Sequence, residues 1–502
     1  MNSRPLSVAM TGTTAARLRD HLLRPDGQED VCLATYRRSR GGQRDTVLLS
    51  ELILPAAGER SVHGNASFTG DYVMRATEIA QGAEAGLALL HSHPGGHGWQ
   101  RMSRPDAGAE QSFAYLVNEL TGLPLVGMTL AGGDEMWSAR SWSASGQETW
   151  AESVRVLDAH LEVSWNDACR PVPPARPSQL RTISGWGDRV QGDITRLRVL
   201  VVGLGSVGLE VALRLAATGI ETVGLMDFDT VEVANLDRLI GATPIDAWLG
   251  RSKVEVARRL VLEAATAAAP HVEVHDLSVC EPAGLAAALN YDVIFSCVDR
   301  PWARAVLNTV AYSDLIPVID GGIHIDPFPD HGMRNATWRS HVMRPGRPCL
   351  VCNGQLDPAA VPLDREGLLD DPVYIGQSDL EAPARQNVAA LSVSVVAALL
   401  AQFVSLVVAP GGAGEPGPLQ YVLSTHTQEQ LARPSRENCA FENAEAFGDR
   451  RPALTGTHRV ADSLRTGRAE RARRVYVRLG NQMDKALLAL RGWLIKIARA
   501  RS

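Results

Sequence analysis

Hydrophobic positions in the second half of the chain fall into short apolar runs that alternate with amphipathic helical stretches. The runs are Val199–Gly203, Glu221–Asp227, Val293–Cys297 and Ile316–Asp320, and a helical pattern over Ser206–Thr218 follows the first of them. Apolar runs rich in β-branched residues and separated by helices are typical of a parallel sheet covered on both faces. The pattern predicts a doubly wound α/β domain over residues 181–450.

Residues 1–165 show a different pattern. Alternating strands are predicted at Asp30–Tyr36, Thr46–Leu54 and Leu87–Leu90, and helices at Arg17–Leu23 and Ala107–Thr121. This mixture predicts a separate α+β unit. The run from Arg170 to Ser178 has four prolines in nine residues, which is typical of a stiff connection, so we place a linker over residues 166–180.

Composition narrows the class of protein. The chain has 502 residues, of which 45% are hydrophobic and 21% charged, and this excludes a disordered chain or a coiled-coil rod. No window approaches about 18 consecutive apolar residues and the start of the chain lacks a signal-peptide pattern, so we expect a cytoplasmic protein. Among seven cysteines only Cys349 and Cys352 are close together, which is not a disulfide framework.

Charge is distributed unevenly along the chain. Residues 451–502 hold 13 Lys and Arg against 3 Asp and Glu, a local net charge of +10, which leaves −16 for residues 1–450 of a chain whose total is −6. We therefore place a basic helical extension over residues 451–502. Between residues 475 and 502 it has an apolar stripe at helical spacing, with apolar positions at Leu479, Met483, Leu487, Leu490, Leu494 and Ile497. Docking on the acidic body is the preferred interpretation, contact with a membrane surface or an acidic partner is an alternative, and no nucleic-acid role is expected.

The first group of candidate chemical residues follows the strand Leu87–Leu90. Alternation along a strand places His91 and His93 on one face, and Asp106 lies a short distance further along the chain. Two imidazoles and one carboxylate leave a tetrahedral Zn²⁺ with an open position for water. An open position indicates a catalytic zinc, because the metal lowers the pKa of bound water to about 7.

These residues resemble the JAMM motif of the JAB/MPN metallopeptidases, which is an upstream Glu, then HxHP, then SxxD. The resemblance implies that His91, His93 and Asp106 bind zinc and that Ser103 stabilises the tetrahedral intermediate. It also implies a general base upstream, for which Glu29 is the best match and Asp30 the alternative. Nine residues separate His93 from Ser103 here, where the family usually has about seven.

The second group is a glycine-rich turn between a strand and a helix, Gly203-Leu-Gly205-Ser-Val-Gly208, with Asp227 ending the next strand. This arrangement binds the phosphates and ribose of a nucleotide. NAD is the usual occupant, but a dehydrogenase does not need the cations and carboxylates that follow. Nucleotidyl transfer does need them, because Lys and Arg neutralise a triphosphate and a carboxylate holds Mg²⁺.

The order of these residues resembles the ThiF/MoeB/E1 superfamily, which adenylates the C-terminal glycine of ubiquitin-like proteins. The resemblance implies that the protein binds ATP and Mg²⁺. The glycines, Asp227 and Asp229 would bind the nucleotide, and Asp299 would bind the magnesium ion. The phosphates would be bound by Asn235, Arg238 and Lys253. Two positions depart from the family motif, Leu239 in place of Gln and Arg300 in place of Asn. Arg181 is a candidate for an arginine that the family supplies from a second subunit.

Cys349 and Cys352 resemble the first half of a structural zinc site of this superfamily. Cys439 and Glu442 stand where the second pair of cysteines is expected. Because Glu can bind zinc, a Cys₃Glu site and a metal-free loop are alternatives, and a thioester-forming role for Cys349 or Cys352 is a third.

The two resemblances together imply a function. A zinc isopeptidase fused to an adenylating domain suggests one ubiquitin-like substrate in a bacterial ubiquitin-like pathway, some of which serve antiphage defence: the first unit trims its C-terminus or removes it from conjugates, and the second activates the exposed glycine. The alternatives are activation of a sulfur-carrier protein for biosynthesis, or a degenerate peptidase that serves as a docking module. A homodimer and an E2-like acceptor protein are expected partners.

Overall fold

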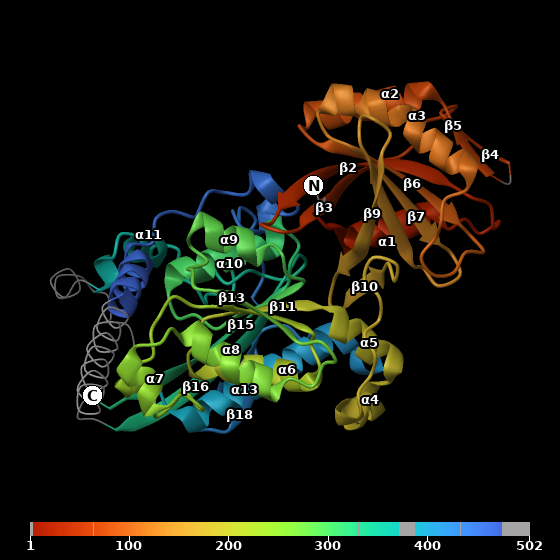
Figure 1. Ribbon diagram of the computed structural model, residues 1–502. Helices are drawn as coiled ribbons and strands as arrows, with labels where there is room; N and C mark the ends of the chain where they lie inside the picture. Colours follow the sequence, from red (N-terminus) through yellow and green to blue (C-terminus); the bar gives the residue numbers. More distant parts are fainter. Residues whose placement is uncertain (1–3, 64, 329–331, 371–386, 432, 474–502) are drawn as a thin grey trace, which may run out of the picture.

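The computed structural model describes residues 4–63, 65–328, 332–370, 387–431 and 433–473 (Figure 1). Two eight-stranded sheets organise this part of the chain, one within residues 6–165 and the other within residues 198–430. The protein is therefore a mixed α/β protein in which each half has its own sheet. The helix predicted over residues 475–502 lies outside the described residues.

The strands of the first unit close into a barrel. Their order is β1-β3-β2-β6-β7-β8-β9-β10, and β1 pairs with β9 as well as with β3. The strands are β1 (Leu6–Thr11), β2 (Val31–Arg40), β3 (Asp45–Ile53), β6 (Gly86–His93), β7 (Leu125–Ala131), β8 (Trp137–Trp142), β9 (Glu148–Leu157) and β10 (Leu161–Trp165), with a separate hairpin of β4 (Arg60–His63) and β5 (Asn65–Phe68). Strand β6 extends three residues beyond the predicted end at Leu90, so it includes both histidines.

Helices pack on both faces of this sheet. On β2, Val31 and Leu33 join a core with α2 (Gly70–Gly82) and α3 (Arg104–Thr121), whereas Cys32 and Ala34 face α1 (Gly12–Leu22). The alternation follows from the two-residue period of a strand. The strand is therefore apolar on both faces, and its neighbour β6 has the same pattern.

The second sheet has the order β13-β12-β11-β14-β15-β16-β17-β18. Its first five strands are parallel and its last three pair antiparallel. The bounds are β11 (Arg198–Val202), β12 (Thr222–Met226), β13 (His271–His275), β14 (Val293–Ser296), β15 (Val318–Pro327), β16 (Met333–Met343), β17 (Leu419–Val422) and β18 (Thr427–Gln430). The chain reverses its direction of winding between β11 and β14, and nucleotides bind at such a point beyond the carboxyl ends of the strands.

Helices cover both faces of the parallel strands, as predicted. On one face lie α6 (Ser206–Thr218), α8 (Lys253–Ala264) and α13 (Ala389–Val408), and on the other α9 (Pro282–Ala288) and α10 (Pro301–Ser313). Shorter helices are α4 (Leu180–Trp186), α5 (Asp188–Arg196), α7 (Pro244–Leu249) and α11 (Ala360–Arg365). Helix α13 is long and apolar enough to cross a membrane, but it packs against α6, β15 and β16.

The two units are packed against each other. Leu157, Leu161 and Trp165 of the first unit belong to the same apolar core as α6 and α13. Beside this core, Arg44 and Arg155 of the first unit bind Asp292 at the start of β14, with N–O distances of 2.5 and 3.1 Å. All three side chains are buried, so the units meet through a desolvated ion cluster as well as through apolar contacts.

Candidate functional site

The glycine-rich turn lies at the reversal point of the second sheet and begins α6. Gly203 has a φ of 86°, and a Cβ there would come within 2.6 Å of the Cys297 carbonyl oxygen. A Cβ on Gly208 would come within 1.8 Å of the Gly203 carbonyl oxygen. Only glycine fits at these two positions, whereas Gly205 faces open space at the N-terminal end of α6, where an anion is favoured.

Asp227 is buried directly after β12 and holds the turn in place. Its carboxylate accepts hydrogen bonds from the backbone N–H of Leu204, at 2.6 Å, and of Asp229, at 2.7 Å. Burial raises the pKa of this carboxyl, while the nearby Lys253 ammonium acts against the rise. The side chain therefore already lies at the nucleotide edge of the sheet, bonded to the glycine turn.

Lys253 is the first residue of α8, and its Nζ lies 2.7 Å from a carboxylate oxygen of Asp229. Burial by itself lowers the pKa of this lysine, but Asp227 and Asp229 more than offset that effect, so its pKa is raised. The charge of the exposed Asp299, three residues beyond β14, acts on Lys253 in the same direction. The structure thus brings Asp227, Asp229, Lys253 and Asp299 together near the glycine turn.

Three further predicted residues make no contact with the Asp227 and Lys253 group among the contacts that the structure describes. Asn235 ends a short turn and accepts a hydrogen bond from the backbone N–H of Glu232, at 3.1 Å. Arg238 pairs with its neighbour Asp237, at 2.9 Å. Arg181 is exposed on α4, next to Gln179, which contacts the C-terminal end of α6, roughly 20 Å along that 13-residue helix from the glycine turn. Within one chain, Arg181 therefore does not join the site.

Ion pairs and hydrogen bonds that the sequence did not predict support the loop that carries Asp299. Arg300, which replaces the usual Asn, binds Asp370 through a guanidinium nitrogen at 2.6 Å and also pairs with Asp364 of α11. Deeper in the sheet, Asp320 accepts hydrogen bonds from Ser296 and from the buried Arg304. Long-range pairs of this kind leave no local sequence signal.

The second group of predicted residues meets at the end of β6. His91 Nε2 and His93 Nε2 lie 3.2 Å apart, and they are 3.9 and 3.7 Å from Asp106 Oδ2. Two ligand atoms of a tetrahedral zinc ion are about 3.4 Å apart, so the three atoms fit one ion. Burial lowers the pKa of His91 to about 3, so its imidazole is in the neutral form that binds metal.

Glu29 reaches this group through the pairing of β2 with β6. Val31 pairs with His91 in an antiparallel register, so the chain two residues earlier runs beside His93. Burial raises the pKa of Glu29, and the charges of His93 and Asp106 act on it. The alternative base, Asp30, is buried and bonded to Arg60, with its two oxygens 2.5 and 2.6 Å from one guanidinium nitrogen.

Ser103 caps the N-terminus of α3, where its Oγ accepts from the Asp106 N–H and donates to the Asp106 carboxylate at 2.6 Å. This cap orients Asp106 toward the histidines. The Gln100 side chain, which the sequence did not reveal, accepts from His93 Nδ1 at 3.0 Å and leaves Nε2 for a metal. Behind His91, the buried Arg140 pairs with Glu110 and donates to Thr129.

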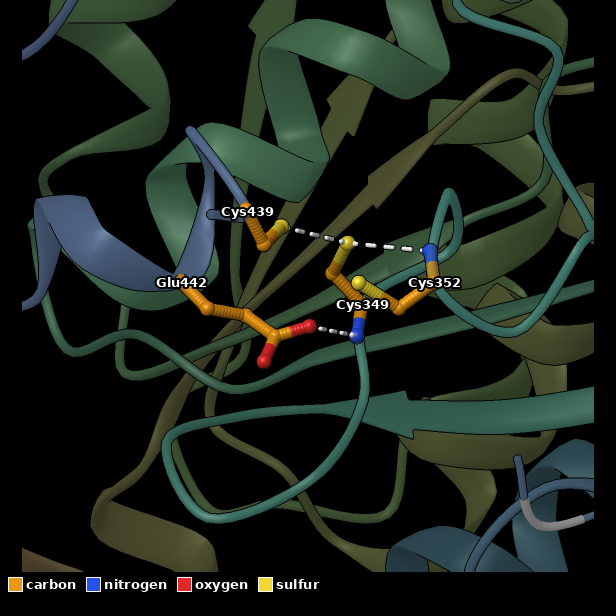
Figure 2. A group of neighbouring side chains, drawn as sticks. All are labelled: Cys349, Cys352, Cys439 and Glu442. Atoms are coloured by element: carbon orange, nitrogen blue, oxygen red, sulfur yellow. Dashed lines mark hydrogen bonds between the residues drawn. The ribbon is translucent and has the colours of Figure 1, made fainter. Parts of the chain in front are cut away.

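The cysteine cluster lies between the end of β16 and the chain that follows β18 (Figure 2). Cys349 Sγ is 3.4 Å from Cys439 Sγ, and the Glu442 carboxylate accepts from the Cys349 N–H at 2.7 Å. One ligand atom from each of Cys349, Cys352, Cys439 and Glu442 lies within 4.8 Å of the others. Three thiols and a carboxylate fit a four-coordinate zinc ion. All three cysteines are buried, which disfavours a thioester with a protein partner.

Comparison with known families identifies the second unit. Residues 178–439, more than half of the chain, match the sequence model of the ThiF family. The chain belongs to the ThiF family. This match begins after the barrel of the first unit, so the assignment of residues 1–165 to the JAB/MPN peptidases is not confirmed and stays a prediction.

Relatives of known sequence match this chain over only part of their own length. The molybdopterin-synthase adenylyltransferase of Escherichia coli (strain K12) is 35% identical over 126 residues, which cover 25% of this chain and 48% of that protein. The probable adenylyltransferase/sulfurtransferase MoeZ of Mycobacterium tuberculosis (strain ATCC 25618 / H37Rv) is 32% identical over 150 residues, 30% of this chain and 37% of that protein. The chain therefore spans about half or less of these relatives.

Among solved structures, the crystal structure of E. coli MccB with ATP is 17% identical in sequence, with a TM-score of 0.41. The alignment covers 53% of this chain and 74% of MccB.

Proposed function

We propose that this ThiF-family chain is an ATP-dependent adenylyltransferase that activates the C-terminal glycine of a small carrier protein. The observation that carries the proposal is the meeting of Asp227, Asp229 and Lys253 at the glycine turn, with Asp299 close enough to influence Lys253. A nucleotide site with this charge pattern suits nucleotidyl transfer better than hydride transfer.

The names of the relatives favour a sulfur-carrier protein as the substrate. They describe a molybdopterin-synthase adenylyltransferase and an adenylyltransferase/sulfurtransferase. Activation of a ubiquitin-like protein for conjugation would use the same residues and is the second substrate class. The homodimer, the E2-like acceptor and the cytoplasmic location remain predictions from the sequence.

The reaction joins a carboxylate oxygen of the glycine to the α-phosphorus of ATP and releases pyrophosphate. Both reactants are anions, so the protein must neutralise charge and align them. Asp227 is placed to accept a ribose hydroxyl, the N-terminus of α6 favours a phosphate, and Lys253 offsets phosphate charge. Asp299 would hold Mg²⁺, which supplies further positive charge at the phosphates.

Exchange of labelled pyrophosphate into ATP tests this proposal. The full chain is incubated with MgATP and with a small β-grasp protein that ends in glycine, one from each substrate class. We expect exchange that requires the carrier protein and is lost when its last glycine is removed. Binding of MgATP without exchange on either class of carrier would show that the proposed acceptor is wrong.

The first unit supports a second candidate function, zinc-dependent hydrolysis of a peptide or isopeptide bond. The observation that favours it is the convergence of His91, His93 and Asp106, with Glu29 brought beside them by strand pairing. Zinc bound there would polarise a carbonyl group and make hydroxide available. Glu29, with its raised pKa, would act as the general base, and trimming after the C-terminal glycine would prepare the carrier for the second unit.

Replacing His93 with alanine should remove one zinc ion per chain and abolish cleavage of a carrier that bears a C-terminal extension. The loss follows because two protein ligands hold a catalytic zinc poorly. Zinc content by mass spectrometry and intact-mass analysis of the carrier measure the two effects. The control is His97→Ala, an exposed histidine of the same loop. Cleavage by His93→Ala at the wild-type rate would contradict a catalytic zinc at this site.

The cysteine cluster should hold a structural zinc, and Cys439→Ser tests this. We expect loss of a different zinc ion from the one that His93→Ala removes, and a lower thermal midpoint, because a structural metal contributes directly to folding. Cys169→Ser, at an exposed cysteine, is the matched control. An unchanged zinc content in Cys439→Ser would show that the cluster is a metal-free loop.

A further inference from the structure

The chain after residue 450 returns to the nucleotide edge of the second sheet. The carbonyl oxygen of Leu454 accepts from Trp302 Nε1 at 2.7 Å, and the Gly456 N–H donates to the Cys280 carbonyl oxygen at 2.8 Å. His458 then stacks on the ring of Trp302, with centroids 5.3 Å apart and planes 5° apart, and its ring lies 4.8 Å from that of Phe228. Phe228 lies between Asp227 and Asp229.

Residues 459–473 continue as a helix along the same edge, in the darkest blue of Figure 1. About halfway along it, Arg465 pairs with Glu281, which precedes α9. Near its described end, an Arg471 nitrogen lies 2.1 Å from where a Cβ on Gly250 would be, three residues before Lys253. From His458 to Arg471 the chain therefore runs from the start of α10, past the turn after β12, to the loop that precedes α8.

Arg468 makes the central contact of this helix. Its guanidinium donates to the Phe228 carbonyl oxygen at 2.7 Å and to the Asp276 carboxylate at 2.5 Å. Its side chain is only 13% exposed. The Arg468 guanidinium thus joins the ends of β12 and β13 and fixes the backbone of the turn Asp227-Phe228-Asp229. Arg468 itself lies beyond residues 178–439, which match the ThiF family.

We propose that Arg468 is a positioning residue for the nucleotide site and that the helix face bearing Arg465, Arg468 and Arg471 forms a wall of that site. The inference rests on the proposed function, because it assumes that MgATP binds beside Asp227. Arg468 acts through the backbone of Phe228, which sets where the two flanking carboxylates lie. A guanidinium suits this role, because its fork satisfies a carbonyl and a carboxylate at once.

The test measures the Kd for MgATP by calorimetry on the full chain, and the KM values in pyrophosphate exchange. We expect Arg468→Gln to weaken MgATP binding about tenfold, which is about 1.4 kcal/mol, and to raise the KM for ATP without a matching fall in kcat. Arg468→Lys should recover part of the affinity, because it restores one charged donor. Arg459→Gln removes the same charge from an exposed position on the same helix and should bind like the wild type.

The outcomes separate this inference from the proposed function. Weaker binding in Arg468→Gln with an unchanged thermal midpoint and partial recovery in Arg468→Lys supports the positioning role, even if no carrier is ever adenylated. Equal MgATP affinity in Arg468→Gln and the wild type overturns it while leaving adenylation intact. An equal loss in Arg459→Gln also overturns it, because the effect would then be one of general charge.

Discussion

Replacing Asp292 with asparagine should lower the free energy of unfolding by about 3–5 kcal/mol, the usual effect of removing one partner from a buried ion pair. The carboxylate lies at the junction of the two units, where it binds Arg44 and Arg155 and accepts from the Arg198 N–H at 2.9 Å. Without its charge, Arg44, Arg155 and Arg198 still lie close together. Within the described cluster, Glu152 is then the buried acidic side chain that offsets their charges. Urea denaturation measures the change.

The control for this variant is Asp326→Asn, which breaks an ion pair with Arg334 at the surface and should leave the midpoint unchanged. Burial would raise the pKa of Asp292, but the three arginines more than offset it and hold the pKa well below its usual range. Because the folded-state pKa lies below the unfolded value of about 3.9, the stabilisation is complete above about pH 4 and is lost as the pH falls further. Equal urea midpoints for Asp292→Asn and the wild type at neutral pH would contradict the stabilising role of the buried cluster.

Replacing Lys253 with alanine should reduce pyrophosphate exchange roughly 10²- to 10³-fold, the usual cost of removing one charged donor that stabilises a transition state. Its side chain is 14% exposed, and its ammonium binds Asp229 and is attracted by the charges of Asp227 and Asp299. A cation from solvent therefore cannot replace it efficiently. The measurement is kcat for exchange at saturating MgATP and carrier.

Arg258→Ala is the matched control, because Arg258 is an exposed cation on the same helix. It should exchange at the wild-type rate. Circular dichroism of both variants separates loss of chemistry from loss of fold. A near wild-type kcat in Lys253→Ala would show that another cation makes the phosphate contact, which would contradict the site as described.

The nucleotide unit was predictable because its signals are local. The strand–turn–helix pattern around Gly203 and Gly208 appears as β11 and α6, since a β-branched run and a glycine turn specify both their conformation and their connection. The same holds for His91 and His93, whose two-residue spacing places them on one face of β6. In both places the covalent chain alone brings the groups together.

Other parts of the sites depend on register and packing. Glu29 reaches His93 only because β2 pairs with β6 in one register, and a shift of one residue would turn it to the other face. Gln100 contacts His93 from a loop, and Arg140, on a different strand, donates to Thr129, whose hydroxyl lies 3.4 Å from His91 Nε2. Such partners were beyond prediction, because nothing in the local pattern marks which distant strand a residue will meet.

By itself, the sequence determined the alternation of apolar strands and helices that begins the second unit, the glycine turn with Asp227, and the histidine pair, because each depends on residues near one another in the chain. Only the tertiary structure decided that the two units share a core and a buried ion cluster, and that Arg468 returns to the turn at Phe228. These contacts join residues up to 248 positions apart. Their formation depends on how whole elements pack, since burial of charge is stable only where the fold supplies the opposite charge.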